Sequence, residues 1–222
     1  MIGFSIAQRP RRIAPEMVAA FAELPVSVVS DSMQRMSAAG AALRPLHAGG
    51  VLAGAALTVR VRPGDNLMLH KALDMAEPGD VIVVDGGGAL DNALMGEMMI
   101  AHAAKRGVVG VVIDGAVRDL DAIRQGRFPV YAAGVTHRGP YKDGPGEINA
   151  PVSLRGMVVN PGDLVLGDAD GVLAVPIDAA EEVLKAAQAK LAAEERQMAA
   201  IAAGTSDRSW IDATLRAKGL QP

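Results

Sequence analysis

Residues 78–119 read PGDVIVVDGGGALDNALMGEMMIAHAAKRGVVGVVIDGAVRD, and this stretch decides the fold class. A Pro-Gly-Asp turn precedes a short, continuous apolar run at Val81–Val84, and a glycine-rich loop follows the run. The next residues, 90–107, have helical spacing and predict a helix of about four turns that ends at Gly107. A second apolar run then leads into GAVRD. Uninterrupted apolar strands that alternate with a helix are typical of parallel strands covered on both faces.

The same rhythm continues on both sides of this stretch. Downstream, DLDAIRQGRFPVYAAG predicts a short helix and a third strand. Upstream, Leu57, Val59 and Val61 alternate with polar residues, which predicts a half-buried strand. Residues 66–75 return to helical spacing. We therefore expect an α/β fold with a central β-sheet flanked by helices.

The two ends of the chain predict further helices. Residues 15–39 contain the expected N-terminal helices, and Ile177–Ala203 predicts a long, alanine-rich C-terminal helix that packs on another surface, such as a neighbouring subunit. Between the central region and that helix, residues 135–149 predict a long loop, and residues 151–176 predict short strands in an antiparallel or mixed sheet. No linker is apparent, so we expect one domain over residues 1–222.

Composition excludes several classes of protein. The chain has 222 residues, of which 50% are hydrophobic, and this suffices for a sizeable core. The absence of cysteine excludes disulfides, a thiolate nucleophile and cysteine-ligated metals, and it favours a reducing compartment, so we expect a cytoplasmic protein. A net charge of −3 and 3% aromatic residues argue against nucleic-acid binding. No apolar run is long enough to span a membrane.

Polar residues that follow the predicted strands are the first candidates for chemistry. Arg118 and Asp119 end the second apolar strand, where open α/β sheets place their ligands. Arginine pairs with a carboxylate through its planar fork, and aspartate offers a hard oxygen to Mg²⁺ or Mn²⁺. The alternative is an ion pair within the chain that caps the strand. Glu97, in the first turns of the preceding helix, is either a functional acid or a complement to the helix dipole. The glycines at 86–88 let the chain turn and can expose N–H groups to a small anion.

Other ionisable residues have simpler interpretations. We interpret the acids at further strand ends as turn formers, namely Asp85, Asp114 and Asp168. The four histidines are scattered, and Glu97 and His102 lie about 140° apart around a helix. A histidine-rich zinc site is therefore not expected.

Several segments together resemble a known family. They are GDNLMLHKALDMAEPGDVIVVDGGG, GEMMIAHAAKRGVVGVVIDGAVRD, FPVYAAG and NPGDLVLGDADGVLAVP, and they resemble the 4-hydroxy-4-methyl-2-oxoglutarate / 4-carboxy-4-hydroxy-2-oxoadipate aldolases over roughly residues 20–205. That family shares its fold with the regulator of ribonuclease activity A, which implies a central mixed sheet akin to swivelling β/β/α domains. Its most specific motif is an acid, twenty intervening residues and Arg-Asp, here Glu97 followed by Arg118 and Asp119.

The resemblance implies a metal-dependent (class II) pyruvate aldolase that uses Mg²⁺ or Mn²⁺. Asp119 is implied to bind the metal directly, and Glu97 is implied to bind it through water. Glu194 of a neighbouring subunit, with Glu195 as the alternative, is implied to complete the metal shell through water. Arg118 is implied to bind the keto-acid end of the substrate and, with Glu97, to take part in catalysis. The family's aldolases commonly carry Asp at the position of Glu97, so the carboxylate here lies one methylene further out.

The resemblance also implies a substrate, an assembly and an alternative function. The backbone N–H groups of a six-residue segment are implied to receive the pyruvyl carboxylate, namely Leu94, Met95, Gly96, Glu97, Met98 and Met99. The reaction is cleavage of a 4-hydroxy-2-oxo dicarboxylic or tricarboxylic acid to pyruvate and a second keto acid, with oxaloacetate decarboxylation as a side activity. The family forms homotrimers or dimers of trimers, which implies an oligomerisation role for the helix at 177–203. The alternatives are a related enzyme acting on another 2-keto acid and a non-catalytic regulator that binds a ribonuclease, although a regulator has no need of an acid and an Arg-Asp pair at this spacing.

Overall fold

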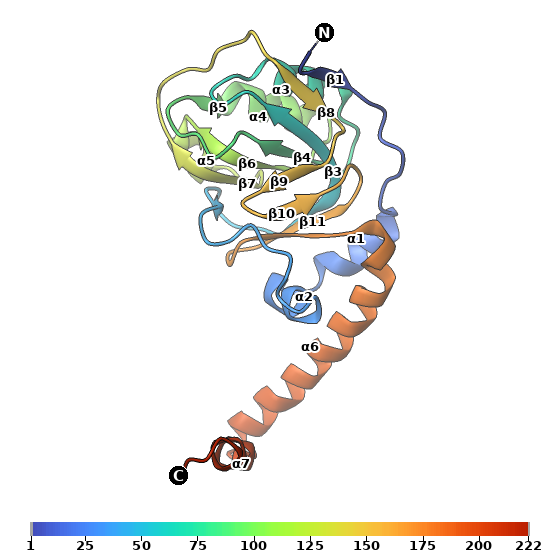
Figure 1. The fold of residues 1–222 in the computed structure, drawn as a ribbon, viewed down its shortest axis with the longest axis vertical. Coiled ribbons are helices and arrows are strands. Elements are labelled where there is room, and N and C mark those ends of the chain that lie inside the picture. The colour runs from blue at the N-terminus through green and yellow to red at the C-terminus, as the bar shows by residue number, and fades with distance from the viewer. Residues whose placement is uncertain (1, 222) are drawn as a thin grey trace.

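The structure is a computed structural model that describes residues 2–221. A mixed β-sheet lies at the centre of the fold (Figure 1). The strands are β1 (Phe4–Ile6), β2 (Arg44–Pro45), β3 (Leu52–Val61), β4 (Asp80–Asp85), β5 (Ala93–Met95), β6 (Gly110–Val117), β7 (Val130–Val135), β8 (Gly146–Ile148), β9 (Val152–Leu154), β10 (Met157–Val159), β11 (Leu164–Gly167) and β12 (Val172–Val175). The helices are α1 (Pro15–Ala22), α2 (Val26–Ser32), α3 (Leu67–Met75), α4 (Glu97–Lys105), α5 (Leu120–Gln125), α6 (Ala180–Ala202) and α7 (Ser209–Ala217), and a 3-10 turn, η1, covers Ile177–Ala179.

The sheet is mixed, with parallel strands at its centre. Within the described residues it has ten strands, and its main path runs β1-β8-β3-β4-β6-β7-β2. β3, β4, β6 and β7 are parallel neighbours, β5 adds to the end of β6, and β11 pairs antiparallel with β3 and β12. β9 and β10 form a separate antiparallel pair. The predicted fold class, an α/β fold with a central mixed sheet, flanking helices and a long C-terminal helix, is confirmed.

Two apolar cores cover the two faces of the central strands. On β4, Val81 and Val83 pack in a core that includes residues of α1, α2 and α6. Their neighbours Ile82 and Val84 pack on the other face, with α3, α4 and α5. β6 is buried along its whole length. The uninterrupted apolar sequences of these strands reflect this double burial, as predicted.

β3 differs from the half-buried strand that the alternation over residues 57–62 predicts. Thr58, expected on the solvent face, is fully buried, and its hydroxyl donates a hydrogen bond of 2.7 Å to the carbonyl of Ala150. β3 is a central strand, because it pairs with β4 on one side and with β8 and β11 on the other. Its faces are covered by other elements, because α3 packs with Leu57 and Val59 on one face, and α1 and β9 pack with Ala56 on the other. Within the strand only Arg60 is exposed.

The N-terminal helices are shorter than the region predicted for them, residues 15–39. α2 ends at Ser32, and Gln34 and Arg35 then adopt φ angles of 57° and 62°. These left-handed values do not continue a right-handed helix, so the chain turns there. The long loop predicted for residues 135–149 also differs, because it contains β8, which pairs with both β1 and β3.

The helix predicted for residues 90–107 forms only in its second half. Ala93–Met95 is strand β5, which lies parallel to the end of β6 with Ala93 opposite Ala116, and its three residues are buried. α4 begins after it, at Glu97. The apolar residues before α4 therefore extend the sheet instead of forming a helix face. Helical spacing alone does not reveal the pairing of these residues with β6.

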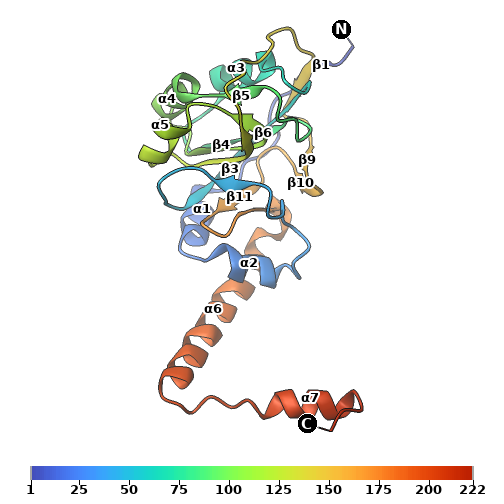
Figure 2. The same ribbon diagram turned by 90° about the vertical axis from the view of Figure 1, so that its left-hand side faces the viewer.

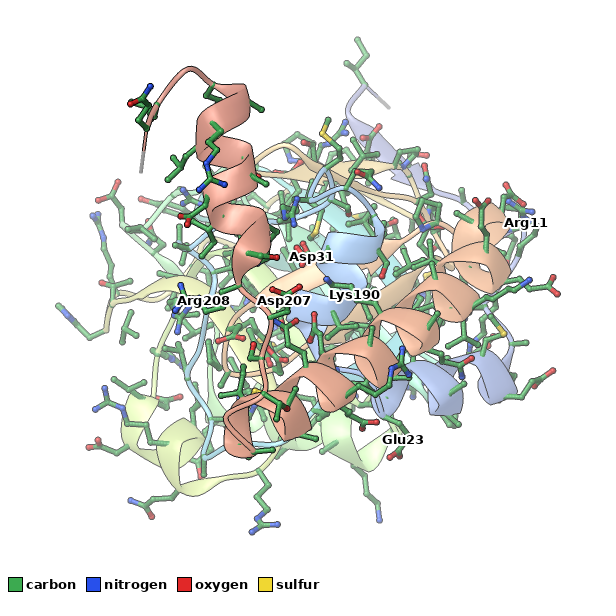
Figure 3. The ribbon with its side chains drawn as sticks, turned by 90° about the horizontal axis from the view of Figure 1, so that it is seen from below. Arg11, Glu23, Asp31, Lys190, Asp207 and Arg208 are labelled. Atoms are coloured by element: carbon green, nitrogen blue, oxygen red, sulfur yellow. The ribbon has the colours of Figure 1, made fainter. Side chains whose placement is uncertain are left out.

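The C-terminal helix predicted over 177–203 is observed as η1 and α6. Its first half packs against α1 and α2, with Ala187 buried and the Lys190 ammonium 3.1 Å from the Asp31 carboxylate (Figure 3). The second half of α6 and all of α7 extend away from the sheet (Figure 2). Met198 and Trp210 in this extension are about two-thirds exposed. No helix among residues 2–221 has the length and apolar composition needed to cross a membrane.

Candidate active site

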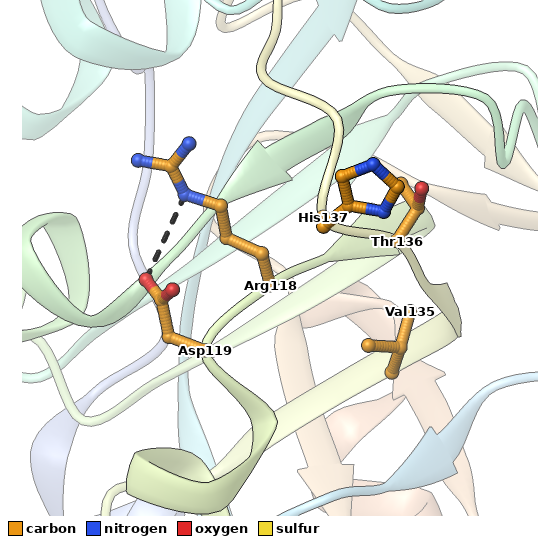
Figure 4. A pocket seen from close by; sticks show the side chains of 5 residues that line it. All are labelled: Arg118, Asp119, Val135, Thr136 and His137. Atoms are coloured by element: carbon orange, nitrogen blue, oxygen red, sulfur yellow. Dashed lines mark ion pairs between the residues drawn. The ribbon is translucent and has the colours of Figure 1, made fainter.

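Arg118, Asp119 and Glu97 come together at one edge of the sheet, where β6 ends and α4 begins. β4, β6 and β7 are parallel, so their carboxyl ends share this edge, which is where open α/β sheets place ligands. Arg118 and Asp119 follow β6, and Thr136 and His137 follow β7 beside them (Figure 4).

A hydrogen bond between Asp119 and the backbone of Glu97 joins the two parts of the acid-plus-Arg-Asp motif. The Oδ2 atom of Asp119 accepts it from the Glu97 N–H at 2.9 Å, across 22 positions of sequence. Between these two residues the chain forms the rest of α4 and then β6, which brings it back to the same edge of the sheet. The Asp119 carboxylate therefore lies at the N-terminal end of α4, where the helix dipole favours a negative charge.

The backbone of Asp119 is unusual, and its side chain is accessible. Its φ and ψ angles of 62° and 42° are left-handed, a conformation found mostly at Gly, Asn and Asp. Such backbone strain is concentrated at functional sites. The side chain is 42% exposed, and its second oxygen, Oδ1, has no partner among residues 2–221. The carboxylate is therefore open to a ligand.

Arg118 makes only a loose ion pair. Its Nε atom lies 3.7 Å from Oδ2 of Asp119, and both side chains are nearly half exposed. No other carboxylate within the described part of the chain lies within 4.0 Å of this guanidinium. An exposed pair at this distance contributes little to stability. The geometry thus leaves the arginine fork available to an anion, the first of the two interpretations offered by the sequence.

Gly96 allows these groups to approach one another. A Cβ atom at this position would overlap the Asp119 carboxylate and lie 2.9 Å from Cγ of Arg118. Its backbone is extended, so the requirement for glycine comes from space and not from its φ angle.

The helix start offers fewer backbone donors than the resemblance implies. The N–H of Glu97 already donates to Asp119, and the N–H of Met99 donates to the carbonyl of Gly96 at 3.1 Å. The N–H groups of Gly96 and Met98 have no acceptor in the part of the chain that the structure describes. Two unpaired N–H groups at a helix N-terminus are a favourable position for an anionic group.

Two cavities open beside Arg118 and Asp119. One of about 270 Å³ is lined by these two residues and Val135–His137 (Figure 4). The other, of about 250 Å³, is lined by the same pair, by the residues around the start of α4, and by three polar residues that the sequence did not single out: Asn66, His70 and Lys142. Only a weak sequence signal marks these three residues, because their position beside the cavity depends on how α3 and the loop before β8 fold against α4.

The donor set at this edge suits a hard cation that keeps much of its water. Within residues 2–221, no three His, Cys, Asp or Glu side chains are grouped so that they could hold a metal ion together. Asp119 offers one unpartnered oxygen, and Glu97 is exposed in the first turn of α4. Mg²⁺ and Mn²⁺ bind through few carboxylates and retain waters, whereas zinc normally requires three or more protein ligands. The residues present fit Mg²⁺ or Mn²⁺.

Glu194 and Glu195 lie elsewhere within one chain. Both are on α6, which packs on the face of the sheet opposite α4. The Glu194 carboxylate is 3.1 Å from the ammonium of Lys190. A single subunit therefore does not bring either glutamate to Asp119.

The acids interpreted as turn formers have structural partners. Asp114 is buried and lies 2.9 Å from Nε of Arg155. Asp85 accepts a hydrogen bond from the N–H of Gly87, and Asp168 accepts one from the N–H of Val26. Asp85 forms a turn as predicted, and so does Asp168, which also accepts a hydrogen bond from the N–H of Asp170. Asp114 forms an ion pair in place of the predicted turn.

Comparison with known proteins places the chain in a family. The family model described as RraA-like, Aldolase/RraA, matches residues 26–174. The chain belongs to the RraA-like family. A relative from Halalkalibacterium halodurans, provisionally named 4-hydroxy-4-methyl-2-oxoglutarate aldolase, is 38% identical over 186 residues, which are 84% of this chain and 89% of that protein.

Solved RraA-like structures share the fold. An uncharacterised protein from Pseudomonas syringae pv. tomato superimposes with a TM-score of 0.79 at 26% identity, covering 88% of this chain and 96% of that one. RraAS2 of Streptomyces coelicolor, described as an unusual member of the RNase ES inhibitor RraA protein family, gives a TM-score of 0.76 at 27% identity, covering 83% and 96%. The resemblance read from the sequence is thereby confirmed at the level of family and fold, and the relatives' names cover both a lyase and a ribonuclease inhibitor.

Proposed function

We propose that this RraA-like chain is a divalent-metal-dependent pyruvate aldolase. Its substrate is a 4-hydroxy-2-oxo dicarboxylic or tricarboxylic acid, such as 4-hydroxy-4-methyl-2-oxoglutarate, and its products are pyruvate and a second keto acid. The observation that carries the proposal is the hydrogen bond from the Glu97 N–H to Asp119. It gathers a carboxylate, an exposed arginine and the two unpaired N–H groups of α4 beside one cavity. A 2-keto acid has complementary groups in its carboxylate and its keto oxygen.

Each group has a role in this reaction. The N–H groups of Gly96 and Met98 bind the pyruvyl carboxylate, and Leu94, Met95 and Met99 shape the wall behind it. Arg118 faces the keto oxygen, where negative charge develops as pyruvate leaves as an enolate.

The acidic residues hold the metal and move the proton. Asp119 would hold Mg²⁺ or Mn²⁺ directly, and Glu97 would hold it through water. The bound cation supplies positive charge at the keto and carboxylate oxygens. Glu97, exposed at the start of α4, accepts the proton of the 4-hydroxyl group through water as the C3–C4 bond breaks, and the proton returns by the same water to C3 of the enolate to give pyruvate.

The assembly and location are part of the same proposal. We place Glu194, or Glu195 beside it, in the water shell of a neighbouring subunit's metal, in a homotrimer or a dimer of trimers. The exposed apolar side chains of α6 and α7 support a role for this tail in subunit contacts. The cysteine-free composition supports a cytoplasmic location.

A pyruvate-release assay tests the proposal. Purified protein with added Mg²⁺ or Mn²⁺ should release pyruvate from 4-hydroxy-4-methyl-2-oxoglutarate. It should also decarboxylate oxaloacetate, because that reaction passes through the same enolate. Chelator treatment should abolish both activities, and added cation should restore them. Equal turnover by chelated and untreated protein, or no turnover of either substrate, would contradict the proposal.

A non-catalytic regulator of a ribonuclease is the second candidate. It is favoured by the likeness to RraAS2, which is described as belonging to a ribonuclease inhibitor family. This candidate predicts a stable complex with a ribonuclease that forms equally well in the presence of a chelator. A pull-down at physiological salt that recovers no ribonuclease removes it.

A further inference from the structure

The segment between β1 and α1, which descends one side of the molecule in Figure 1, lines a further cavity of about 300 Å³. Its other walls are the end of α3 and Asn149, which follows β8. None of its lining residues lines the two cavities beside Arg118. Asn66, just before α3, lines the cavity of about 250 Å³, whereas Met75, the last residue of α3, lines this one. The cavity is therefore separate from the proposed active site, and a ligand in it is independent of the proposed function.

The charged groups around this cavity balance one another. The guanidinium of Arg9 lies 2.7 Å from the buried carboxylate of Asp80 and 3.1 Å from that of Glu77. Arg12 makes a second contact with each acid, at 3.3 Å and 3.2 Å. Arg11, the third arginine on the wall, pairs with an exposed aspartate of η1. Because each positive charge has a negative partner, the cavity favours a ligand without net charge.

Polar atoms of both kinds remain without partners on the cavity wall. Asn149 is 8% exposed, and its amide nitrogen donates to the carbonyl of Ala7 at 2.9 Å, whereas its amide oxygen has no donor within residues 2–221. The Oε1 atom of Glu77 accepts no hydrogen bond from those residues. The Nε–H groups of Arg9 and Arg12 likewise have no acceptor among them. A buried acceptor without a donor is costly, which points to a ligand or a water that supplies one.

The remaining wall of the cavity is apolar. It is formed by Leu57 of β3 and by Met75. A site of this size suits a small molecule that buries most of its surface. Two unfilled acceptors, two cationic N–H groups and an apolar wall together match an ammonium, a carboxylate and an aliphatic chain.

We propose that this cavity binds a free aliphatic amino acid in its zwitterionic form. The ammonium donates to the amide oxygen of Asn149 and to Oε1 of Glu77, and the carboxylate accepts from the Nε–H groups of Arg9 and Arg12. The aliphatic side chain lies on the apolar wall. The zwitterion adds one positive and one negative charge, so it fills the unpaired groups and preserves the charge balance of the cavity.

Calorimetry with matched probes tests the ligand class. L-leucine, L-isoleucine or L-valine should bind saturably at one site per chain. For L-leucine, two analogues each lack one charge: 4-methylpentanoate has no ammonium, and 3-methylbutylamine has no carboxylate. Both should bind at least about tenfold more weakly, because each leaves one set of polar groups without a partner. Saturable binding by none of the three amino acids, or equal binding of L-leucine and both analogues, would overturn the inference.

A charge-removing variant tests the ammonium contact. Glu77→Gln should weaken L-leucine binding by about threefold to fivefold, the effect of losing an exposed ion pair, and should not weaken 4-methylpentanoate binding. The matched control is Glu23→Gln, which alters an exposed acid after α1 that does not line the cavity, and it should change neither affinity. Equal losses of both ligands in Glu77→Gln, or an equal loss of L-leucine in Glu23→Gln, contradicts the proposed contact.

NMR of the amide groups locates the bound amino acid. Addition of L-leucine should shift the side-chain amide signals of Asn149, because the amide oxygen then gains a donor. The backbone amides of Gly96 and Met98, at the start of α4, should not shift. Shifts at Gly96 and Met98 without a shift at Asn149 would place the amino acid in the proposed active site and would overturn the inference.

Discussion

Arg118 is the residue whose loss is expected to affect catalysis most directly. Its guanidinium is nearly half exposed and makes only the 3.7 Å contact with Asp119. Arg118→Ala should therefore leave the fold intact and lower kcat for pyruvate release by about 10²–10³-fold, the usual effect of removing one donor that stabilises developing negative charge.

The matched control is Arg124→Ala, which removes an exposed arginine from the neighbouring helix α5. Turnover and thermal unfolding measured on both variants check the expectation. Unchanged turnover in Arg118→Ala, or an equal loss in Arg124→Ala, speaks against a catalytic arginine at this position.

The sequence identifies individual site residues only where a local rule applies. Arg118 and Asp119 could be selected because they end an apolar strand, and Glu97 because it lies in the first turns of the predicted helix. The hydrogen bond between Asp119 and the N–H of Glu97 could not be derived, since it depends on the left-handed turn at Asp119 and on the space left by Gly96. His70 and Lys142 were missed because no local pattern distinguishes them from solvent-exposed cations.

At the scale of elements, Asp65 joins the loop before β8 to the start of α3, and this connection should depend on pH. Burial raises the pKa of the Asp65 carboxyl, but hydrogen bonds from the backbone N–H groups of Leu67, Asp143 and Gly144 and the charge of Arg62 outweigh it, so the pKa lies below its ordinary value of 3.8. A carboxyl with a lowered folded-state pKa stabilises the fold above its unfolded-state pKa. That contribution is lost as the pH falls through the lower, folded-state value.

Asp65→Asn should therefore lower the free energy of unfolding by about 1.5–3 kcal/mol at pH 7, the range for hydrogen bonds to a charged group. The difference from the wild type should shrink below about pH 4. Urea unfolding at pH 7 and pH 3 measures both quantities. Asp143→Asn is the control: its side chain is 77% exposed, and the change should stay within about 0.5 kcal/mol. If the free energies of unfolding of Asp65→Asn and the wild type differ by the same amount at pH 7 and pH 3, this account is contradicted.

A whole helix or strand can be predicted from sequence where its pattern of apolar residues fits only one kind of element. The apolar runs of β4 and β6 identify strands covered on both sides, and the alanine-rich pattern over 177–203 identifies α6. The predictions for the residues of β5 and β3 are wrong for the same reason. Their environment is set by elements outside the segment itself: Ala93–Met95 pair with β6, and the faces of β3 are covered by α1, α3 and β9. Local periodicity contains no information about such neighbours.

At the scale of the whole molecule, we propose that a second subunit completes the site, and mixing variants tests this proposal. Asp119→Ala and Glu194→Ala should each be inactive in pyruvate release. Co-refolded or co-expressed mixtures should regain activity, because some sites then combine an intact Asp119 from one chain with an intact Glu194 from its neighbour.

Light scattering should show a mass of three or six times 22.9 kDa for the wild type. Mixing Asp119→Ala with Asp119→Asn provides the control, since no combination of these chains restores Asp119. A monomeric mass, or mixtures of Asp119→Ala and Glu194→Ala that stay inactive, contradicts a shared site. Of the two single variants, Glu194→Ala and Glu195→Ala, the one that is inactive on its own identifies the glutamate that contributes.

The 22-position link between Glu97 and Asp119 also restricts how this chain can vary in length. Each residue of α4 turns the helix by about 100° and advances it by about 1.5 Å, so one inserted or deleted residue between the two would swing the Glu97 amide away from the carboxylate that it meets. The segment from the start of α4 to the end of β6 should therefore tolerate substitution far better than any change in its number of residues. The exposed connection between α6 and α7 has no such fixed register, and it is the more suitable place to introduce a tag or an insertion.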